Sequence, residues 1–196
     1  MNEKKADRRV RKTKALLCNA LTKLLMEKEL REISVMELTE LADVNRGTFY
    51  LHYRDIYDLY EHIENNVLEN FKSLLMYDST KGEKLVIYSV VLWAFRFIAD
   101  NAEMCMAILK QGDRAFLEKM FDLCRDKSLE EWISKRGHSS VKFHDYYFSF
   151  ATSGCVGLVQ AWLAGGMKED PENMANMANK LIMGCLHSVN NTVGHS

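Results

Sequence analysis

Only one proline, Pro171, occurs among the 196 residues of the chain. Proline interrupts helices, so its near absence leaves long stretches in which helices can form. The sequence also lacks the alternating apolar and polar pattern that is typical of strands. Together these features predict an all-α fold of about nine helices, and the chain is long enough to bury a core without disulfides or metals.

The stretch from Ser34 to Tyr53 predicts two short helices joined by a tight turn. Ser34 and Glu37 have the spacing of a capping box at the start of the first helix. Asn45 can cap the second helix, whose Phe49 is the apolar residue that reaches inward. The apolar face of the first helix is expected from residues at helical spacing: Val35, Leu38 and Leu41. The exposed face of the second helix would carry hydrogen-bonding side chains and few carboxylates, which suits the major groove of DNA.

The run from Ala42 to Tyr53, with its Gly-Thr-Phe-Tyr-x-His-Tyr core, closely resembles the signature of the TetR family of transcriptional regulators. The resemblance implies a dimeric, all-helical protein with an N-terminal helix-turn-helix and a C-terminal domain that binds an effector. It implies a three-helix DNA-binding domain over residues 1–54. A larger helical domain for ligand binding and dimerisation would follow over residues 55–196, with 55–76 as a linking helix capped by Asp55.

The resemblance and the predicted helix face together indicate eight DNA-contacting residues: Ser34, Asn45, Arg46, Gly47, Thr48, Tyr50, His52 and Arg54. Arg46 is the best candidate for reading a base, because a guanidinium can engage the edge of a guanine. Gly47 would let the helix backbone approach DNA closely. Two such helices related by a two-fold axis require a near-palindromic operator in double-stranded DNA.

Three positions depart from the usual pattern of the family. Asp43 lies at the turn where glycine is frequent, although aspartate tolerates left-handed backbone angles better than most residues. Ile56 stands where family members commonly carry a lysine that contacts phosphate, so Arg54 is expected to supply that contact. The segment 29–32 lacks the glycine that usually follows the first helix, and we expect a tighter or partly helical loop.

Residues 1–14 carry seven basic and two acidic side chains, although the formal net charge of the whole chain is −1. A basic segment beside a helix-turn-helix is the pattern expected for contact with DNA phosphates. The alternative is a disordered segment that only increases solubility, and both could hold if the segment orders on binding.

Five further helices are expected after the linking helix, at residues 83–101, 103–110, 113–135, 141–164 and 171–189. The helix at 83–101 is apolar nearly all round, which predicts a central position and makes Arg96 unusual. Arg96 could pair with a protein carboxylate, meet an anionic ligand or lie exposed at the domain edge. The family resemblance implies a small-molecule pocket, for which the candidate residues are Trp93, Arg96, Phe97, Tyr147 and Phe150.

The helix at 141–164 has apolar residues on two faces, one for its own core and one for a partner subunit. This pattern and the last helix resemble the dimerisation element of the family, in which two copies form a four-helix bundle. The expected interface residues are Phe148, Cys155, Val159, Trp162, Leu181 and Cys185. Without pairing, this apolar face would be larger than soluble monomers usually tolerate.

No catalytic or metal-binding constellation is apparent in the sequence. The segment 153–157 approaches a nucleophile elbow but lacks the preceding strand, and the five cysteines have no CxxC spacing. We therefore expect no enzyme activity, cofactor or metal, and a cytoplasmic protein without a membrane span. The sequence predicts a DNA-binding transcriptional regulator, a repressor controlled by a small molecule, or alternatively a regulator or coactivator whose C-terminal domain binds a protein partner.

Overall fold

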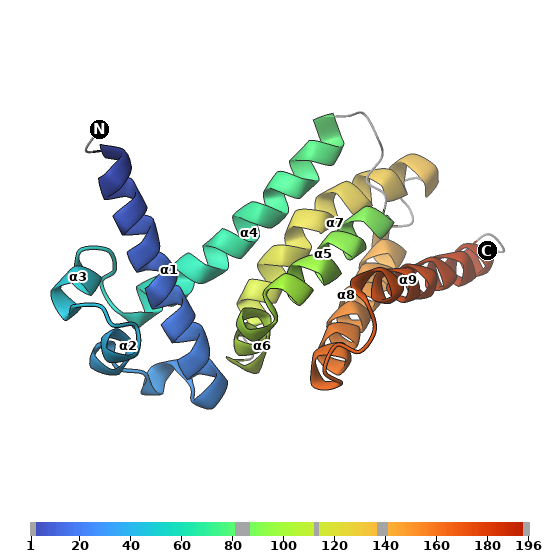
Figure 1. Cartoon of the computed structure of the whole chain (residues 1–196). Helices are drawn as coiled ribbons and strands as arrows, with labels where there is room; N and C mark the ends of the chain where they lie inside the picture. The colour runs from blue at the N-terminus through green and yellow to red at the C-terminus, as the bar shows by residue number, and fades with distance from the viewer. Residues whose placement is uncertain (1–2, 81–86, 112–113, 137–140, 194–196) are drawn as a thin grey trace. The chain divides into compact units, whose positions relative to one another are not determined.

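The computed structural model describes residues 3–80, 87–111, 114–136 and 141–193, and all regular structure in these ranges is helical (Figure 1). The elements are α1 (Glu3–Glu27), the 3-10 helix η1 (Leu30–Glu32), α2 (Val35–Leu41), α3 (Arg46–Tyr50), α4 (Ile56–Thr80), α5 (Ile87–Asp100), α6 (Ala102–Gln111), α7 (Arg114–Arg136), α8 (Val141–Ala164) and α9 (Pro171–Val193). Nine α-helices within the described ranges confirm the predicted all-α class.

The chain divides into two compact units. The first contains Met1–Glu69 and Glu103–Asp113, and the second contains Asn70–Ala102 and Arg114–Ser196. The expected division at residue 54, between a DNA-binding and a ligand-binding domain, concerns function and stays a prediction.

The first unit is held together by the inward faces of α1, α2, α3 and the start of α4. Leu17, Leu21, Leu38, Phe49 and Leu59 have no exposed surface. Helix α1 begins at Glu3, so the described part of the basic segment is helical and not irregular.

Helix α2 turns a different set of side chains inward from the set predicted. Leu38 is fully buried, but Leu41 is 50% exposed and Ala42 is buried in its place. The prediction for Leu41 was wrong because it assumed that the next buried residue lies three positions after Leu38. In the structure that residue is Ala42, four positions on, which lies on the same helix face as Leu38. The loop before α2 forms η1, which confirms the expected partly helical connection.

Helix α6 belongs to the first unit although the chain enters and leaves it through the second. The Gln111 side chain accepts a hydrogen bond from the Leu30 backbone N–H at 3.0 Å and donates one to the Lys28 carbonyl at 3.4 Å. The Lys110 ammonium donates to the Met26 carbonyl at 2.6 Å. These contacts bind α6 to the segment that joins α1 to α2.

The second unit has its core where α5, α8 and α9 meet. Phe95 lies edge-on to Trp162, with ring centroids 5.4 Å apart, and Ala175 and Ala178 of α9 complete the buried cluster. Pro171 is the first residue of α9, where proline's missing N–H costs nothing. Within the described residues, no helix is both long enough and apolar enough to span a membrane.

Candidate nucleic-acid interface and C-terminal cavity

Helix α3 is short, and its ends are fixed by specific contacts. The Asn45 side-chain oxygen accepts a hydrogen bond from the Gly47 N–H at 2.7 Å, which caps the helix as predicted. Phe49 is fully buried and lies edge-on to Tyr50, at a centroid distance of 5.3 Å. With Phe49 anchored inside, the opposite face of α3 points to solvent.

Arg46 and Tyr50 lie together on this outer face, one turn apart. The guanidinium donates a hydrogen bond to the Tyr50 hydroxyl at 3.3 Å, and its carbon is 5.7 Å from the ring centroid. Both residues are exposed. This contact holds the donor fork of Arg46 on the surface of the helix, where a base edge could be reached.

Gly47 is needed for the Asn45 cap at the start of α3. A Cβ added at Gly47 would lie 3.1 Å from the Asn45 side-chain oxygen, so a larger residue would disturb the hydrogen bond that starts α3. The preceding turn contains Asp43 with φ 50°, the left-handed conformation that its position predicted. Gly47 and Asp43 therefore fix the orientation of α3 relative to α2.

The other predicted DNA contacts lie in α3 and in the segments before and after it. Ser34 is exposed and caps α2 by accepting the Glu37 N–H at 3.2 Å, whereas Thr48 and His52 are half-buried. Arg54 has a highly exposed side chain whose guanidinium is 3.6 Å from the Asp58 carboxylate. Ser34 and Arg54 are therefore accessible from solvent, and Thr48 and His52 are so only in part.

The start of α4 explains why no phosphate contact is available from Ile56. This side chain is only 5% exposed and belongs to the core of the first unit. Asp55 caps the helix by accepting the Asp58 N–H at 2.9 Å, and Asp58 in turn accepts the Arg54 N–H at 2.8 Å. This reciprocal arrangement lowers the pKa of Asp58, chiefly through the Arg54 backbone N–H, and fixes the position of Arg54.

The second unit contains a cavity of about 200 Å³. Its lining comes from α4, α5, α7, α8 and α9: Phe71, Val90, Val91, Ala94, Phe95, Met120, Phe121, Cys124, Ser128, Tyr147, Phe148, Ala151, Thr152, Cys155, Val159 and Ile182. Of the five residues expected to bind a ligand, Tyr147 lines this cavity. The contribution of α7 was not predicted, because helix periodicity does not identify which apolar residues face a cavity.

The other four expected ligand residues lie elsewhere in the second unit. Trp93 and Phe97 stack on one another with ring centroids 5.1 Å apart. Arg96 is 58% exposed and donates to the Glu172 carboxylate at 2.8 Å, so it is paired and exposed at the same time. Phe150 is 65% exposed.

The residues expected at a dimer interface do not share one surface in the structure. Phe148, Cys155 and Val159 line the cavity. Trp162 is buried in its own core, where its indole N–H donates to the Glu169 carbonyl at 3.0 Å. Cys185 is half-buried against Tyr147 and Ile182, and Leu181 is 54% exposed. Among the residues whose burial is described, the large apolar side chains that α8 and α9 expose are Phe143, Tyr146, Phe150, Met177 and Leu181.

One unit presents a short capped helix with an exposed hydrogen-bonding face, and the other contains an apolar cavity, which is the arrangement expected of an all-helical DNA-binding regulator. The TetR family model described as "Transcriptional regulator C-terminal region" matches residues 86–184, about half of the chain. The chain therefore belongs to the TetR family of transcriptional regulators.

Several solved structures share the fold. A TetR transcriptional regulator from Streptococcus agalactiae is 19% identical, with a TM-score of 0.60 over 90% of this chain and 97% of that chain. The fatty acid degradation regulator FadR from Bacillus halodurans is 15% identical, with a TM-score of 0.66 over 88% and 95%. NalD, the secondary repressor of the MexAB-OprM multidrug efflux pump in Pseudomonas aeruginosa, is 18% identical, with a TM-score of 0.63 over 89% and 95%. No curated protein sequence matches the chain.

Proposed function

We propose that the protein is a homodimeric, sequence-specific repressor whose affinity for DNA is controlled by a small molecule bound in the C-terminal unit. The observation that carries this proposal is the outer face of α3, where Arg46 and Tyr50 are exposed above a helix fixed by the Asn45 cap and by buried Phe49. Such a face can enter a major groove without rearrangement of the helix that carries it.

In the proposed complex, Arg46 reads a guanine edge, and Gly47 lets the backbone of α3 approach the DNA. Thr48, Tyr50 and His52 hold phosphates or a thymine methyl group. Ser34 and Arg54 contact phosphates on either side. The basic side chains in the first turns of α1 are exposed, which suits contact with the DNA backbone: Arg8, Arg9, Arg11 and Lys12.

A second copy of the chain would cover the exposed apolar face of α8 and α9. Between these helices lies an apolar groove of about 150 Å³, bordered by exposed Phe150 and Leu181. No atom outside their own helices lies within 4 Å of a Cβ built at Gly154 or Gly157, so a partner helix could approach α8 closely there. We infer that this face forms the dimer, because the residues buried inside each chain cannot contribute to it.

Effector control requires that ligand binding favours a spacing of the two α3 helices that no longer matches the operator. Helix α4 continues from the first unit into the second. Helix α6 lies between α5 and α7 in the chain and is hydrogen-bonded to the loop after α1 through Lys110 and Gln111. Both helices are candidate routes by which a change in the C-terminal unit reaches α2 and α3.

Selection of binding sites from random DNA with the full-length protein tests the DNA-binding part of this proposal. We expect enrichment of a near-palindromic sequence and a dimer in sedimentation at micromolar concentration. Deletion of residues 1–12 should make binding less dependent on salt, because fewer counterions are released from DNA. A monomer, or no enriched sequence, would contradict the proposal.

A further inference from the structure

We propose that the cavity of the C-terminal unit selects an uncharged, largely aromatic molecule of one or two rings, and disfavours anions and cations. This inference rests on the proposed effector control, since it names the chemical class of the effector. It is drawn from the lining of the cavity, the use of its few polar groups and the pairing of the charges beside it.

The lining is apolar and rich in aromatic rings and sulfur. None of its described residues is charged, and five are aromatic: Phe71, Phe95, Phe121, Tyr147 and Phe148. Met120, Cys124 and Cys155 add polarisable sulfur atoms, which contact aromatic rings favourably. Burial raises the pKa of the Cys155 thiol, so this group stays neutral at physiological pH. An aromatic ligand would therefore meet aromatic rings and sulfur on several sides.

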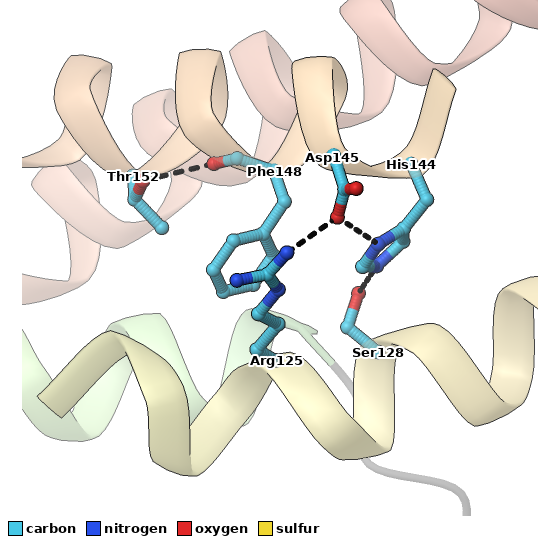
Figure 2. A network of polar contacts seen from close by, with 6 residues as sticks. All are labelled: Arg125, Ser128, His144, Asp145, Phe148 and Thr152. Carbon is cyan, nitrogen blue, oxygen red and sulfur yellow. Dashed lines mark hydrogen bonds and ion pairs between the residues drawn. The ribbon is translucent and has the colours of Figure 1, made fainter. Parts of the chain in front are cut away.

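The polar groups that line the cavity are already used within the protein. Tyr147 donates its hydroxyl proton to the Ile182 carbonyl at 3.4 Å, and Thr152 donates to the Phe148 carbonyl at 2.8 Å. The Ser128 hydroxyl shares a hydrogen bond of 3.0 Å with the His144 ring (Figure 2). A ligand group that needs strong hydrogen bonds would have to displace these contacts, which disfavours carboxylates and ammonium groups.

The ionic groups near the cavity neutralise one another. Figure 2 shows Arg125 of α7 pointing toward Asp145 of α8, and the two groups are 2.7 Å apart. His144 is fully buried and stacks on Phe148, and this burial lowers the pKa of its imidazole, so the ring is uncharged at neutral pH. Arg96, the cation that the sequence suggested for an anionic ligand, is paired with Glu172. No unpaired cation is therefore available among these residues to hold an anion.

The size of the cavity limits the ligand. At about 200 Å³ it is somewhat larger than the roughly 150 Å³ apolar cavity that is known to accept benzene. A single substituted ring or a fused pair of rings fits this volume, whereas a long acyl chain would extend out of it.

Probes with the same ring system but different charge test this class directly. Binding of 2-methylnaphthalene, 2-naphthoate and 2-naphthylmethylammonium to the full-length protein would be compared by calorimetry or thermal shift. We expect the neutral probe to bind roughly tenfold or more tightly than either ion, because a buried unpaired charge loses its hydration. Decalin, a saturated bicycle of similar size, should bind several-fold more weakly than 2-methylnaphthalene. Equal or tighter binding of either ion would overturn the proposal, and so would equal binding of decalin.

Variants locate the site. Ala94→Leu should abolish binding of 2-methylnaphthalene by filling the cavity, whereas Ala15→Leu, the same change on the exposed surface of α1, should not alter it. Because a larger residue can destabilise a core, Thr152→Val gives a second test that preserves volume. This variant should bind the neutral probe at least as tightly as the native protein, and weaker binding would contradict the proposal, because it would mean that binding depends on the hydroxyl and not on the apolar lining. Unchanged binding in Ala94→Leu would show that the probe binds elsewhere.

A DNA-binding measurement separates this inference from the proposed function. Release of operator DNA by 2-naphthoate, with no binding of the neutral probe, would refute the ligand class and leave effector control intact. Tight binding of the neutral probe without any change in DNA affinity would refute effector control through this cavity and leave the binding preference standing.

Discussion

The proposed DNA-binding surface and the C-terminal cavity are built in opposite ways. The first comes from one continuous stretch around α2 and α3, where a single buried ring, Phe49, supports the whole outer face. The second is assembled from five helices, and its lining residues are mostly half-buried around an open space. The difference suggests that single substitutions will affect the reading surface sharply, while the cavity tolerates change because its contacts are distributed and incomplete.

Phe49→Ala should produce the largest effect. Removing a fully buried ring costs about 3–5 kcal/mol of unfolding free energy, and the outer face of α3 would lose its support. Phe121→Ala is the matched change in the cavity lining and should cost clearly less, because this half-buried ring already lacks packing partners on one side. Urea unfolding of both variants measures the difference. Equal losses of unfolding free energy would contradict the view that the cavity tolerates substitution better than the α3 region.

Arg46→Ala should change DNA recognition without a comparable loss of stability, since the side chain is exposed. The expected loss is roughly 1–3 kcal/mol of discrimination at one base position of each half-site. Arg31→Ala removes another exposed arginine of the same unit, outside α3, and serves as the control for charge. Binding-site selection measures the preference, and an unchanged preference at every position would remove Arg46 as the base reader.

Two substitutions to glycine compare the backbone strain in the two units. Asp43 in the first unit and Met167 in the second have φ values of 50° and 52°. Asp43→Gly should stabilise by up to about 1 kcal/mol, because its exposed side chain loses little and the left-handed strain is relieved. Met167→Gly relieves the same strain but removes a side chain packed against the Phe95 and Trp162 cluster, so it should destabilise. Thermal unfolding gives both signs, and stabilisation by both variants would mean that the Met167 packing contributes nothing.

Much of the first unit could be predicted because its signals are local. The caps at Ser34, Asn45 and Asp55 each depend on residues two or three positions away, and all three caps form. Only the Ser34 half of the expected capping box is seen, because the Glu37 carboxylate pairs with Lys28. The attachment of α6 could not be predicted in this way, since Gln111 bonds to Leu30 across 81 positions of the chain.

The lining of the cavity was harder to predict because α5 and α8 are apolar on more than one side. Phe148 and Phe150 are two residues apart and therefore point to nearly opposite sides of α8, yet nothing in the sequence distinguishes them. In the structure Phe148 lines the cavity and Phe150 is exposed. Periodicity identifies faces of a helix, and only packing decides which face is inside.

Arg96→Ala should have the smallest effect, because both partners of the Arg96–Glu172 pair are substantially exposed to solvent. The hydrogen bond from Arg96 lowers the pKa of Glu172 below its ordinary value of 4.5. A carboxyl with a lowered pKa contributes stability above its ordinary pKa, and this contribution disappears as the pH falls through the lowered value. The variant should therefore be slightly less stable than the native protein near neutral pH and equal to it in strong acid. Thermal unfolding across this pH range, with Glu172→Gln and the double variant completing a cycle, measures the coupling. A loss as large as that of Phe49→Ala, or one that persists in acid, would mean that Arg96 supports the fold by packing and not through this pair.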